Sequence, residues 1–446
     1  MRISVVGCGY LGAVHAACMA DLGHEVVGLD VDAAKVRDLA AGRPPFFEPG
    51  LPDLLTRAAD SGRLRFTTDS SALAPTGPDT GPMVHFVCVG TPQRSGEFAA
   101  DTSYVDAAVT ALLPVLRPGD LVVGKSTVPV GTAARLAELI CDKAPGALLA
   151  WNPEFLREGH AVADTQHPDR IVYGLPADPD DAAAARALLD AVYATAIGAG
   201  VPMITMDYQT AELVKTAANA FLATKISFIN AMAEVCEAAG ADVALLAEAI
   251  GHDERIGPKF LGAGLGFGGG CLPKDIRAFM ARAGELGADQ ALTFLREVDA
   301  INMRRRIRMV ELARDVVGGS FLGHKVAVLG AAFKPQSDDI RDSPALNVAA
   351  QIQLQGAEVV VTDPTAVDNA RRSWPQLHYA ATAQEACTGA DVVLLLTEWQ
   401  EYRDLDPVAL GAIVRTRQVL DGRNALDPAR WRAAGWTYRA LGRPRA

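Results

Sequence analysis

The chain has 446 residues, half of them apolar and 21% charged, and its formal net charge is −11. This length predicts two or three domains, and the acidic balance argues against nucleic acid as the main partner. The seven cysteines lack CxxC or Cys/His spacing, no apolar run reaches the ~18–20 residues of a membrane span, and the first residues lack a signal-peptide pattern. We therefore expect a cytoplasmic protein without a disulfide framework, a metal site or a membrane span.

The first elements predict a nucleotide-binding turn. A strand-like run from Arg2 to Val6 leads into the sequence GCGYLG, an alanine-rich helix to Leu22 and a second strand that ends at Asp30. Glycines in such a turn let the backbone approach a pyrophosphate, and the acid binds ribose hydroxyls. Asp30 favours NAD over NADP because it would repel a 2′-phosphate. Lys35, in the next helix, is also within reach of the ribose. The predicted cofactor residues here are Gly7, Gly9, Tyr10, Leu11, Gly12, Asp30 and Lys35.

Two further apolar strands are each followed by a threonine. Residues 84–89 precede Thr91, and residues 121–125 precede Thr127. Polar residues after parallel strands lie at the carboxyl edge of the sheet, where α/β proteins bind ligands. Both threonines are therefore candidates, with helix capping as the alternative. The Pro/Gly-rich stretch 74–82 predicts a surface loop.

The next apolar strand, over residues 146–150, is followed by Glu154 and Glu158. If this segment is helical, the two carboxylates share one face. Pairs at this spacing are commonly only solvated, but this pair follows a strand at the same predicted edge.

A long amphipathic helix without glycine or proline is predicted over residues 209–240. Lys215 and Asn219 lie four residues apart on it and project together. The alternative for Lys215 is a side chain that merely extends along a half-buried helix to reach water.

A glycine-rich loop, residues 262–275, contains six glycines in nine residues and then Cys271. Pro273 is well suited to the first turn of a helix. A helix N-terminus and the neighbouring Lys274 should lower the pKa of the thiol and favour the thiolate. For a lone cysteine the alternative is simple packing. Arg255, just before the loop, is a candidate anion ligand.

The last part of the chain repeats the order of the first. Strands over residues 325–330, 356–363 and 390–396 predict a second doubly wound domain that lacks the glycine turn. The turn over residues 333–341 supplies Lys334 and Arg341 at the edge where phosphates bind. We predict an α/β fold of two Rossmann-like doubly wound domains joined by a long central helix and a helical middle region. The expected boundaries are 1–198, 199–310 and 311–446.

Eight motifs, in this order, resemble those of the UDP-glucose/GDP-mannose dehydrogenase family. They are GCGYLG, GLDVDAAKV, VGTP, STVPVGT, NPEFLREG, AELVKTAANAFLATKISFINA, GFGGGCLPKD and FKPQSDDIRDSP. The resemblance covers nearly the whole chain. It implies that the long helix forms a dimer core in a homodimer or larger homo-oligomer, and that the chain catalyses two successive NAD-dependent oxidations of a sugar C6 alcohol to a carboxylate.

The resemblance also implies catalytic roles. Cys271 would add to the C6 aldehyde to give a thiohemiacetal, and the second hydride transfer would leave a thioester that water hydrolyses. Lys215 would act as an acid/base or stabilise developing charge on the C6 oxygen, helped by Asn219. Asp275 would position or activate water or Lys215. The water and proton of thioester hydrolysis would be handled by Glu154 and Thr127.

Binding roles follow from the same resemblance. Cofactor contacts are implied for Thr91, Thr127, Glu158, Lys274 and Arg341. Substrate contacts are implied for Glu154, Phe155, Leu156, Lys215, Asn219, Arg255, Phe267, Gly268, Gly269, Gly270, Lys334 and Arg423. Arg255 would be offered to a neighbouring subunit, and Arg341 would reach NAD across domains.

UDP-glucose, oxidised to UDP-glucuronate, is the expected substrate. Leu272 also occurs in the GDP-mannose branch, whereas STVPVG, KISFIN and Arg255-Ile256-Gly257 resemble the UDP-glucose branch. The alternatives are GDP-mannose or UDP-N-acetylmannosamine and, from another class, an idle nucleotide-sugar-binding scaffold. An idle scaffold has no physical reason to keep all five of Cys271, Lys215, Asn219, Asp275 and Glu154. A two-electron alcohol dehydrogenase would need no cysteine.

Overall fold

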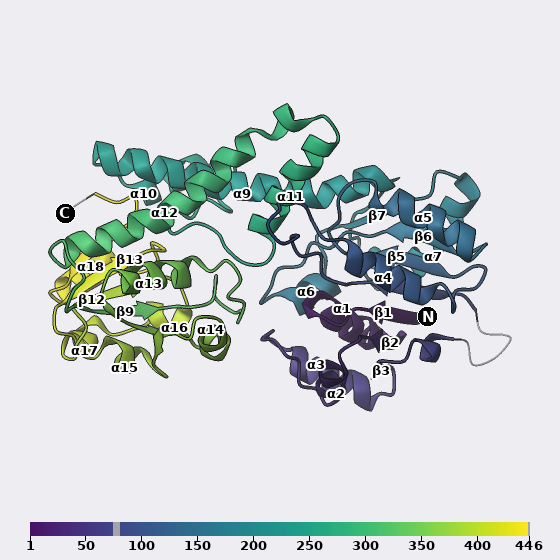
Figure 1. Cartoon of the computed structure of the whole chain (residues 1–446), viewed down its shortest axis with the longest axis horizontal. Helices are drawn as coiled ribbons and strands as arrows, with labels where there is room; N and C mark the ends of the chain where they lie inside the picture. The colour runs from purple at the N-terminus through teal and green to yellow at the C-terminus, as the bar shows by residue number, and fades with distance from the viewer. Residues whose placement is uncertain (75–80, 445–446) are drawn as a thin grey trace. The chain divides into compact units, whose positions relative to one another are not determined.

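The computed structural model describes residues 1–74 and 81–444. The loop predicted over residues 74–82 falls on residues 75–80, which lie outside the described residues. The chain divides into two compact units, which are described separately (Figure 1). Unit 1 comprises Met1–Ala218 and Arg277–Leu286, and unit 2 comprises Asn219–Ile276 and Gly287–Ala446.

Unit 1 contains an eight-stranded sheet among its described residues, in the order β3-β2-β1-β4-β5-β6-β7-β8. Its strands are β1 (Arg2–Val6), β2 (Glu25–Leu29), β3 (Leu64–Thr67), β4 (Met83–Val87), β5 (Leu121–Gly124), β6 (Leu148–Trp151), β7 (Ile171–Leu175) and β8 (Met203–Asp207). Neighbours pair in parallel except β6 and β7. The first six strands therefore have the Rossmann order, and their carboxyl ends lie at one edge.

The helices of unit 1 connect these strands. They are α1 (Tyr10–Asp21), α2 (Ala33–Ala40), α3 (Leu51–Asp60), the 3₁₀ helix η1 (Ser70–Leu73), α4 (Ser103–Leu112), α5 (Thr132–Lys143), α6 (Ala161–Gln166), α7 (Pro179–Val192) and α8 (Ala194–Gly198). Every residue of β4 and β5 is buried. Strands buried on both faces are continuous apolar runs, which is why the sequence located them well.

Unit 2 contains a six-stranded, wholly parallel sheet among its described residues, in the order β11-β10-β9-β12-β13-β14. Its strands are β9 (Lys325–Leu329), β10 (Glu358–Thr362), β11 (His378–Tyr379), β12 (Val392–Leu395), β13 (Gln418–Asp421) and β14 (Thr437–Ala440). The connecting helices are α13 (Pro344–Leu354), α14 (Val367–Ser373), α15 (Ala383–Cys387), α16 (Gln400–Arg403), α17 (Pro407–Gly411) and α18 (Pro428–Ala433). The order is again that of a Rossmann sheet.

The middle of the chain is helical. They are α9 (Tyr208–Ala239), α10 (Val243–Gly251), α11 (Leu272–Glu285), the 3₁₀ helix η2 (Asp289–Leu292) and α12 (Phe294–Val316). The helix predicted over residues 209–240 is α9, displaced by one residue at each end. The predicted fold class is confirmed. The boundaries at 198/199 and 310/311 stay a prediction, because compactness divides the middle helices between the two units.

Within the described parts of the chain, no helix is both long and apolar enough to cross a bilayer. The same residues contain no group of three or more His, Cys, Asp or Glu side chains that could hold a metal ion.

Candidate active site

Two glycines of the first turn, Gly7 and Gly12, lie where no side chain fits. A Cβ at Gly7, whose φ is 88°, would lie 2.6 Å from Val89 Cγ1, and one at Gly12 would overlap the Gly7 carbonyl oxygen. A Cβ at Gly9 would meet nothing within 4 Å, and no side chain caps α1 at this residue. The space beside Gly9 and the absence of a side-chain cap at the start of α1 suit a pyrophosphate.

Asp30 follows β2 beside this turn. Its Oδ2 accepts hydrogen bonds from Cys8 N at 2.8 Å and Lys35 Nζ at 2.9 Å, and its Oδ1 accepts one from Asp32 N at 3.0 Å. In dinucleotide-binding domains a carboxylate at this position accepts hydrogen bonds from the ribose hydroxyls of NAD, and the neighbouring helix N-terminus binds the pyrophosphate. These residues fit the cofactor.

Tyr10 and Glu48 connect the cofactor turn to the segment after Glu158. The Tyr10 hydroxyl donates to Glu48, whose two oxygens accept hydrogen bonds from Gly159 N and Ala161 N, each at 2.7 Å. Burial, together with the hydrogen bond to Glu48, raises the pKa of Tyr10, so the phenol remains a donor. The sequence interpretation missed Glu48, whose local sequence Phe-Phe-Glu-Pro-Gly reads as a loop.

Glu154 and Glu158 do not share a helix face. After β6 the backbone is irregular through Arg157, and Glu158 begins a turn. Pro153 disfavours helical geometry at the residue before it. Side chains also take the amide groups that a helix would use, since Leu156 N donates to the Glu154 carboxylate. The helical arrangement considered from the sequence is wrong.

Phe155 and Leu156, which follow Glu154, pack against other parts of unit 1. Leu156 and Leu11 are half-buried against the same core cluster. Phe155 lies under two cations, with its ring centroid 3.9 Å from Arg170 Cζ and 5.6 Å from Lys215 Nζ.

Thr91 and Thr127 are joined at the sheet edge. Thr91 Oγ1 donates to the Thr127 carbonyl oxygen at 2.7 Å. Helices α4 and α5 have Thr102 and Gly131 at their N-cap positions. The capping alternative for Thr91 and Thr127 is therefore wrong.

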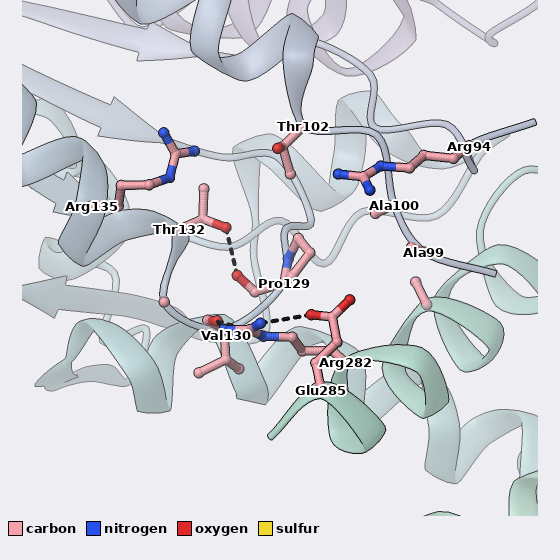
Figure 2. A pocket seen from close by; sticks show the side chains of 12 residues that line it. Arg94, Ala99, Ala100, Thr102, Pro129, Val130, Thr132, Arg135, Arg282 and Glu285 are labelled. Atoms are coloured by element: carbon pink, nitrogen blue, oxygen red, sulfur yellow. Dashed lines mark hydrogen bonds and ion pairs between the residues drawn. The ribbon is translucent and has the colours of Figure 1, made fainter. Parts of the chain in front are cut away.

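A cavity of about 280 Å³ lies beside the loop between β5 and α5 (Figure 2). Arg94 and Arg135 lie on either side of Thr102 in this view, and Arg282 pairs with Glu285 at 2.7 Å. The cavity is lined by Arg94, Ala99, Ala100, Thr102, Pro129, Val130, Gly131, Thr132, Arg135, Ala278, Arg282 and Glu285. None of the sequence-predicted site residues lines it, so it is not the predicted site.

Glu212 of α9 lies next to the same loop. Its carboxylate accepts hydrogen bonds from Gly131 N and Ala133 N, both at 2.7 Å, at the start of α5. Burial raises the pKa of Glu212 to about 7, although these amide groups act in the opposite direction.

In unit 2, the glycine-rich loop is held by side chains and backbone from elsewhere in that unit. Asn302 contacts Phe267 twice, with Oδ1 accepting from its N–H at 2.7 Å and Nδ2 donating to its carbonyl at 3.0 Å. Asn230 Oδ1 accepts from Gly264 N at 2.9 Å, and Gly269 N donates to the Arg341 carbonyl at 2.9 Å.

Neighbouring atoms occupy the space that side chains would need at five glycines of this loop. A Cβ would meet the Gly422 carbonyl oxygen at Gly264, Asn302 Oδ1 at Gly266 and the Asp342 carbonyl oxygen at Gly268. At Gly269 it would meet the Phe333 ring, and at Gly270 the Arg341 guanidinium. Close packing within unit 2 therefore accounts for these glycines before any ligand is considered.

Several predicted anion ligands have protein partners. Arg423 donates to the carbonyls of Leu396 and Gly266, each at 2.8 Å. The exposed side chain of Arg255 pairs with Asp253 at 2.6 Å. Two further predicted ligands also have neighbours: Arg341 pairs with Asp339 at 2.6 Å, and Lys334 Nζ lies 5.5 Å from the centroid of the Phe333 ring.

Cys271 is exposed and precedes α11. Its carbonyl accepts a hydrogen bond from Asp275 N at 2.8 Å, which places it at the N-cap position. The buried Asp275 side chain accepts from Asn219 Nδ2 at 2.6 Å, and Lys274 Nζ lies 2.6 Å from Asp275 Oδ1. Four of the residues predicted from the sequence thus lie together within unit 2. Lys215 belongs to the part of α9 in unit 1.

Three family models together cover most of the chain. Residues 1–197 match the NAD binding domain of the UDP-glucose/GDP-mannose dehydrogenase family, residues 209–304 its central domain and residues 327–428 its UDP binding domain.

Individual proteins are similar over their whole length. A UDP-glucose 6-dehydrogenase of Rhizobium meliloti is 41% identical, with 100% of both chains covered. The structure of a UDP-glucose dehydrogenase from Pyrobaculum islandicum is 39% identical with a TM-score of 0.87, covering 99% of this chain and 98% of that one. A UDP-D-ManNAc dehydrogenase from Pyrococcus horikoshii is 25% identical with a TM-score of 0.85, covering 100% of both chains.

Proposed function

The chain belongs to the UDP-glucose/GDP-mannose dehydrogenase family, and we propose that it oxidises UDP-glucose to UDP-glucuronate in two NAD-dependent steps. The main support for UDP-glucose as the substrate is the 41% identity to a UDP-glucose 6-dehydrogenase over the whole chain. A UDP-D-ManNAc dehydrogenase of similar fold reaches 25%. This difference favours UDP-glucose over UDP-N-acetylmannosamine.

When NAD is bound, it would accept a hydride from C6 in each oxidation. In the proposed mechanism the Cys271 thiolate adds to the C6 aldehyde, and loss of hydride from that carbon leaves a thioester. In the first oxidation Lys215 accepts the proton of the C6 hydroxyl as the hydride leaves, and in both steps Lys215 and Asn219 stabilise negative charge on the C6 oxygen. Asp275 holds Asn219 by the hydrogen bond described above and so orients its amide.

Hydrolysis of the thioester completes the reaction. Glu154, assisted by Thr127, accepts a proton from the attacking water, while the C–S bond breaks and returns the Cys271 thiolate. The position of Glu154 after a strand at the carboxyl edge of the sheet supports this role.

The binding roles are proposed in the same way. The turn from Gly7 to Gly12 and Asp30 hold NAD, with Lys35, Thr91, Glu158, Lys274 and Arg341 as further contacts. The glycine-rich loop, Phe155, Leu156, Arg255, Lys334 and Arg423 bind the nucleotide sugar. The contacts of Arg423 with Leu396 O and Gly266 O support a second role, holding the loop itself.

We propose that the enzyme is a cytoplasmic homodimer or larger homo-oligomer with α9 in the subunit interface. Phe221, Phe228 and Val235 recur every seven residues on α9 and are 66%, 49% and 57% exposed. Such a stripe is typical of a helix that packs against a partner. No disulfide joins the seven cysteines, all of which lie among the described residues, and this fits a reducing compartment.

The test is the number of NADH molecules formed per sugar. Purified protein with limiting UDP-glucose and excess NAD should yield two NADH and one UDP-glucuronate per sugar, and GDP-mannose and UDP-N-acetylmannosamine should react far more slowly. One NADH per sugar would contradict the thioester route. Preference for another nucleotide sugar would contradict the substrate.

A further inference from the structure

A buried ammonium group lies below the carboxyl edge of the unit 1 sheet. Lys125 directly follows β5, and its side chain is 5% exposed. Nζ donates to Asn152 Oδ1 at 2.8 Å and to the Tyr193 hydroxyl at 3.3 Å, both of which are neutral acceptors. It also lies 5.7 Å from the centroid of the Phe86 ring. A cation so enclosed needs a counter-charge.

Glu154 supplies that counter-charge. Its Oε2 lies 3.7 Å from Lys125 Nζ, and its side chain is 18% exposed. Burial, with Lys125 contributing, lowers the pKa of His15 well below its usual range. Burial also raises the pKa of Cys88 to about 12 and raises the pKa of Tyr193 well above its usual value. These three neighbours are therefore neutral near pH 7.

We propose that Lys125 is a positioning residue for Glu154 in hydrolysis of the Cys271 thioester, an inference that rests on the proposed function. Because the backbone around Glu154 is irregular, no helix fixes this side chain. Its two oxygens are held instead by separate groups, since Oε1 accepts from Leu156 N and Oε2 faces Lys125.

The ammonium is itself held in place. Tyr193 donates to Asn152 Oδ1 at 2.6 Å, and Asn152 Nδ2 donates to the Val172 carbonyl at 2.9 Å. The network thus connects β7, the residue after β6 and the residue after α7 to the carboxylate. A fixed cation opposite one oxygen leaves the carboxylate a single favoured orientation at the sheet edge.

The consequence is specific to one step. In hydrolysis, water transfers a proton to Glu154 while its oxygen bonds to the thioester carbon, and the C–S bond breaks to release the Cys271 thiolate. The two hydride transfers need no water. Loss of the Lys125 ammonium should therefore slow release of UDP-glucuronate while NADH formation in the first turnover continues.

The experiment uses the full-length protein with Lys125→Met, UDP-glucose and NAD. We expect a burst of two NADH per active site, a steady state at least tenfold slower than wild type, and a covalent adduct on Cys271 in the intact mass. Lys125→Arg should restore much of the steady-state rate. The matched control is Lys143→Met, which removes an exposed lysine of α5 and should change neither burst nor steady state.

Two results would overturn the role. One is a Lys125→Met enzyme with the wild-type steady-state rate, and the other is equal slowing of the burst and the steady state without an adduct. If Lys125→Met does not fold, Lys125→Gln, which keeps a polar group without the charge, is judged by the same criteria. Failure of the proposed function is distinguishable, because wild-type protein would then form no NADH from UDP-glucose.

Discussion

Gly266→Ala tests whether the glycine-rich loop needs its glycines for packing. Gly266 has a φ of 87°, and a Cβ there would overlap Asn302 Oδ1 and lie 3.1 Å from its Cγ. Asn302 is buried and bonds both the N–H and the carbonyl of Phe267. Alanine should therefore strain the backbone and displace the amide that holds the loop.

The expected cost follows from these two effects. A left-handed conformation at a non-glycine residue costs about 1–3 kcal/mol. Displacing Asn302 leaves the Phe267 N–H buried without an acceptor, at about 1–3 kcal/mol. The Phe267 carbonyl adds no such cost, because it still accepts a hydrogen bond from Arg306 Nη2 at 3.2 Å. The free energy of unfolding should fall by roughly 2–6 kcal/mol, a large part of the ~5–15 kcal/mol of a typical domain.

The matched control lies in the same loop. A Cβ at Gly262 would meet nothing within 4 Å, and its φ is not positive, so Gly262→Ala should change the free energy of unfolding by at most ~0.5 kcal/mol. Denaturant unfolding followed by tryptophan fluorescence reports mainly on unit 2, which contains four of the five tryptophans. Equal effects of the two substitutions would refute the packing explanation.

Three further changes probe the cofactor site, the nucleophile and a buried carboxyl. Asp30→Ala removes the acceptor beside the turn and should raise the KM for NAD at least tenfold, whereas an unchanged KM would show that the cofactor turn is misplaced. Cys271→Ser should bind NAD and UDP-glucose but release no UDP-glucuronate, and retained full turnover would exclude Cys271 as the nucleophile. Glu212 has its pKa raised from 4.5 to about 7, so the folded protein holds this proton more tightly than the unfolded chain. Its stabilising contribution is thus complete below about pH 4.5 and is lost as the pH rises through 7, by roughly 3 kcal/mol. Glu212→Gln should remove this slope from the free energy of unfolding between pH 4.5 and 8, and parallel pH curves for the two proteins would contradict the shifted pKa.

Regular elements and chain-local features were predictable from the sequence. Central strands of both sheets, such as β4, β5, β9 and β12, are buried on two faces and appear as apolar runs. Helix α9 has no glycine or proline to interrupt it. The place of Cys271 at the start of α11 follows from Pro273, which suits the first turn of a helix. These signals lie within a few residues of the feature they predict.

Contacts between distant residues were not predictable. Glu48 meets Tyr10 across 38 residues of sequence, and Lys125 meets Tyr193 across 68. No periodicity encodes such pairs, because they depend on which strands become neighbours in the sheet. The helix considered for Glu154 failed because side-chain carboxylates accept the hydrogen bonds of the Leu156 and Arg157 amide groups, and the Arg157 bond, to Asp164 seven residues away, has no signal in the local pattern.

The placement of the nucleophile depends on the C-terminal turns of unit 2. Gly269 N bonds to the Arg341 carbonyl, and a Cβ at Gly270 would overlap the Arg341 guanidinium, immediately before Cys271. Arg423, from the turn after β13, holds the Gly266 carbonyl. The segments that carry the predicted phosphate ligands therefore also shape the loop that presents the thiol. A change in either turn should alter the position of Cys271 as well as nucleotide-sugar binding, because one set of contacts serves both.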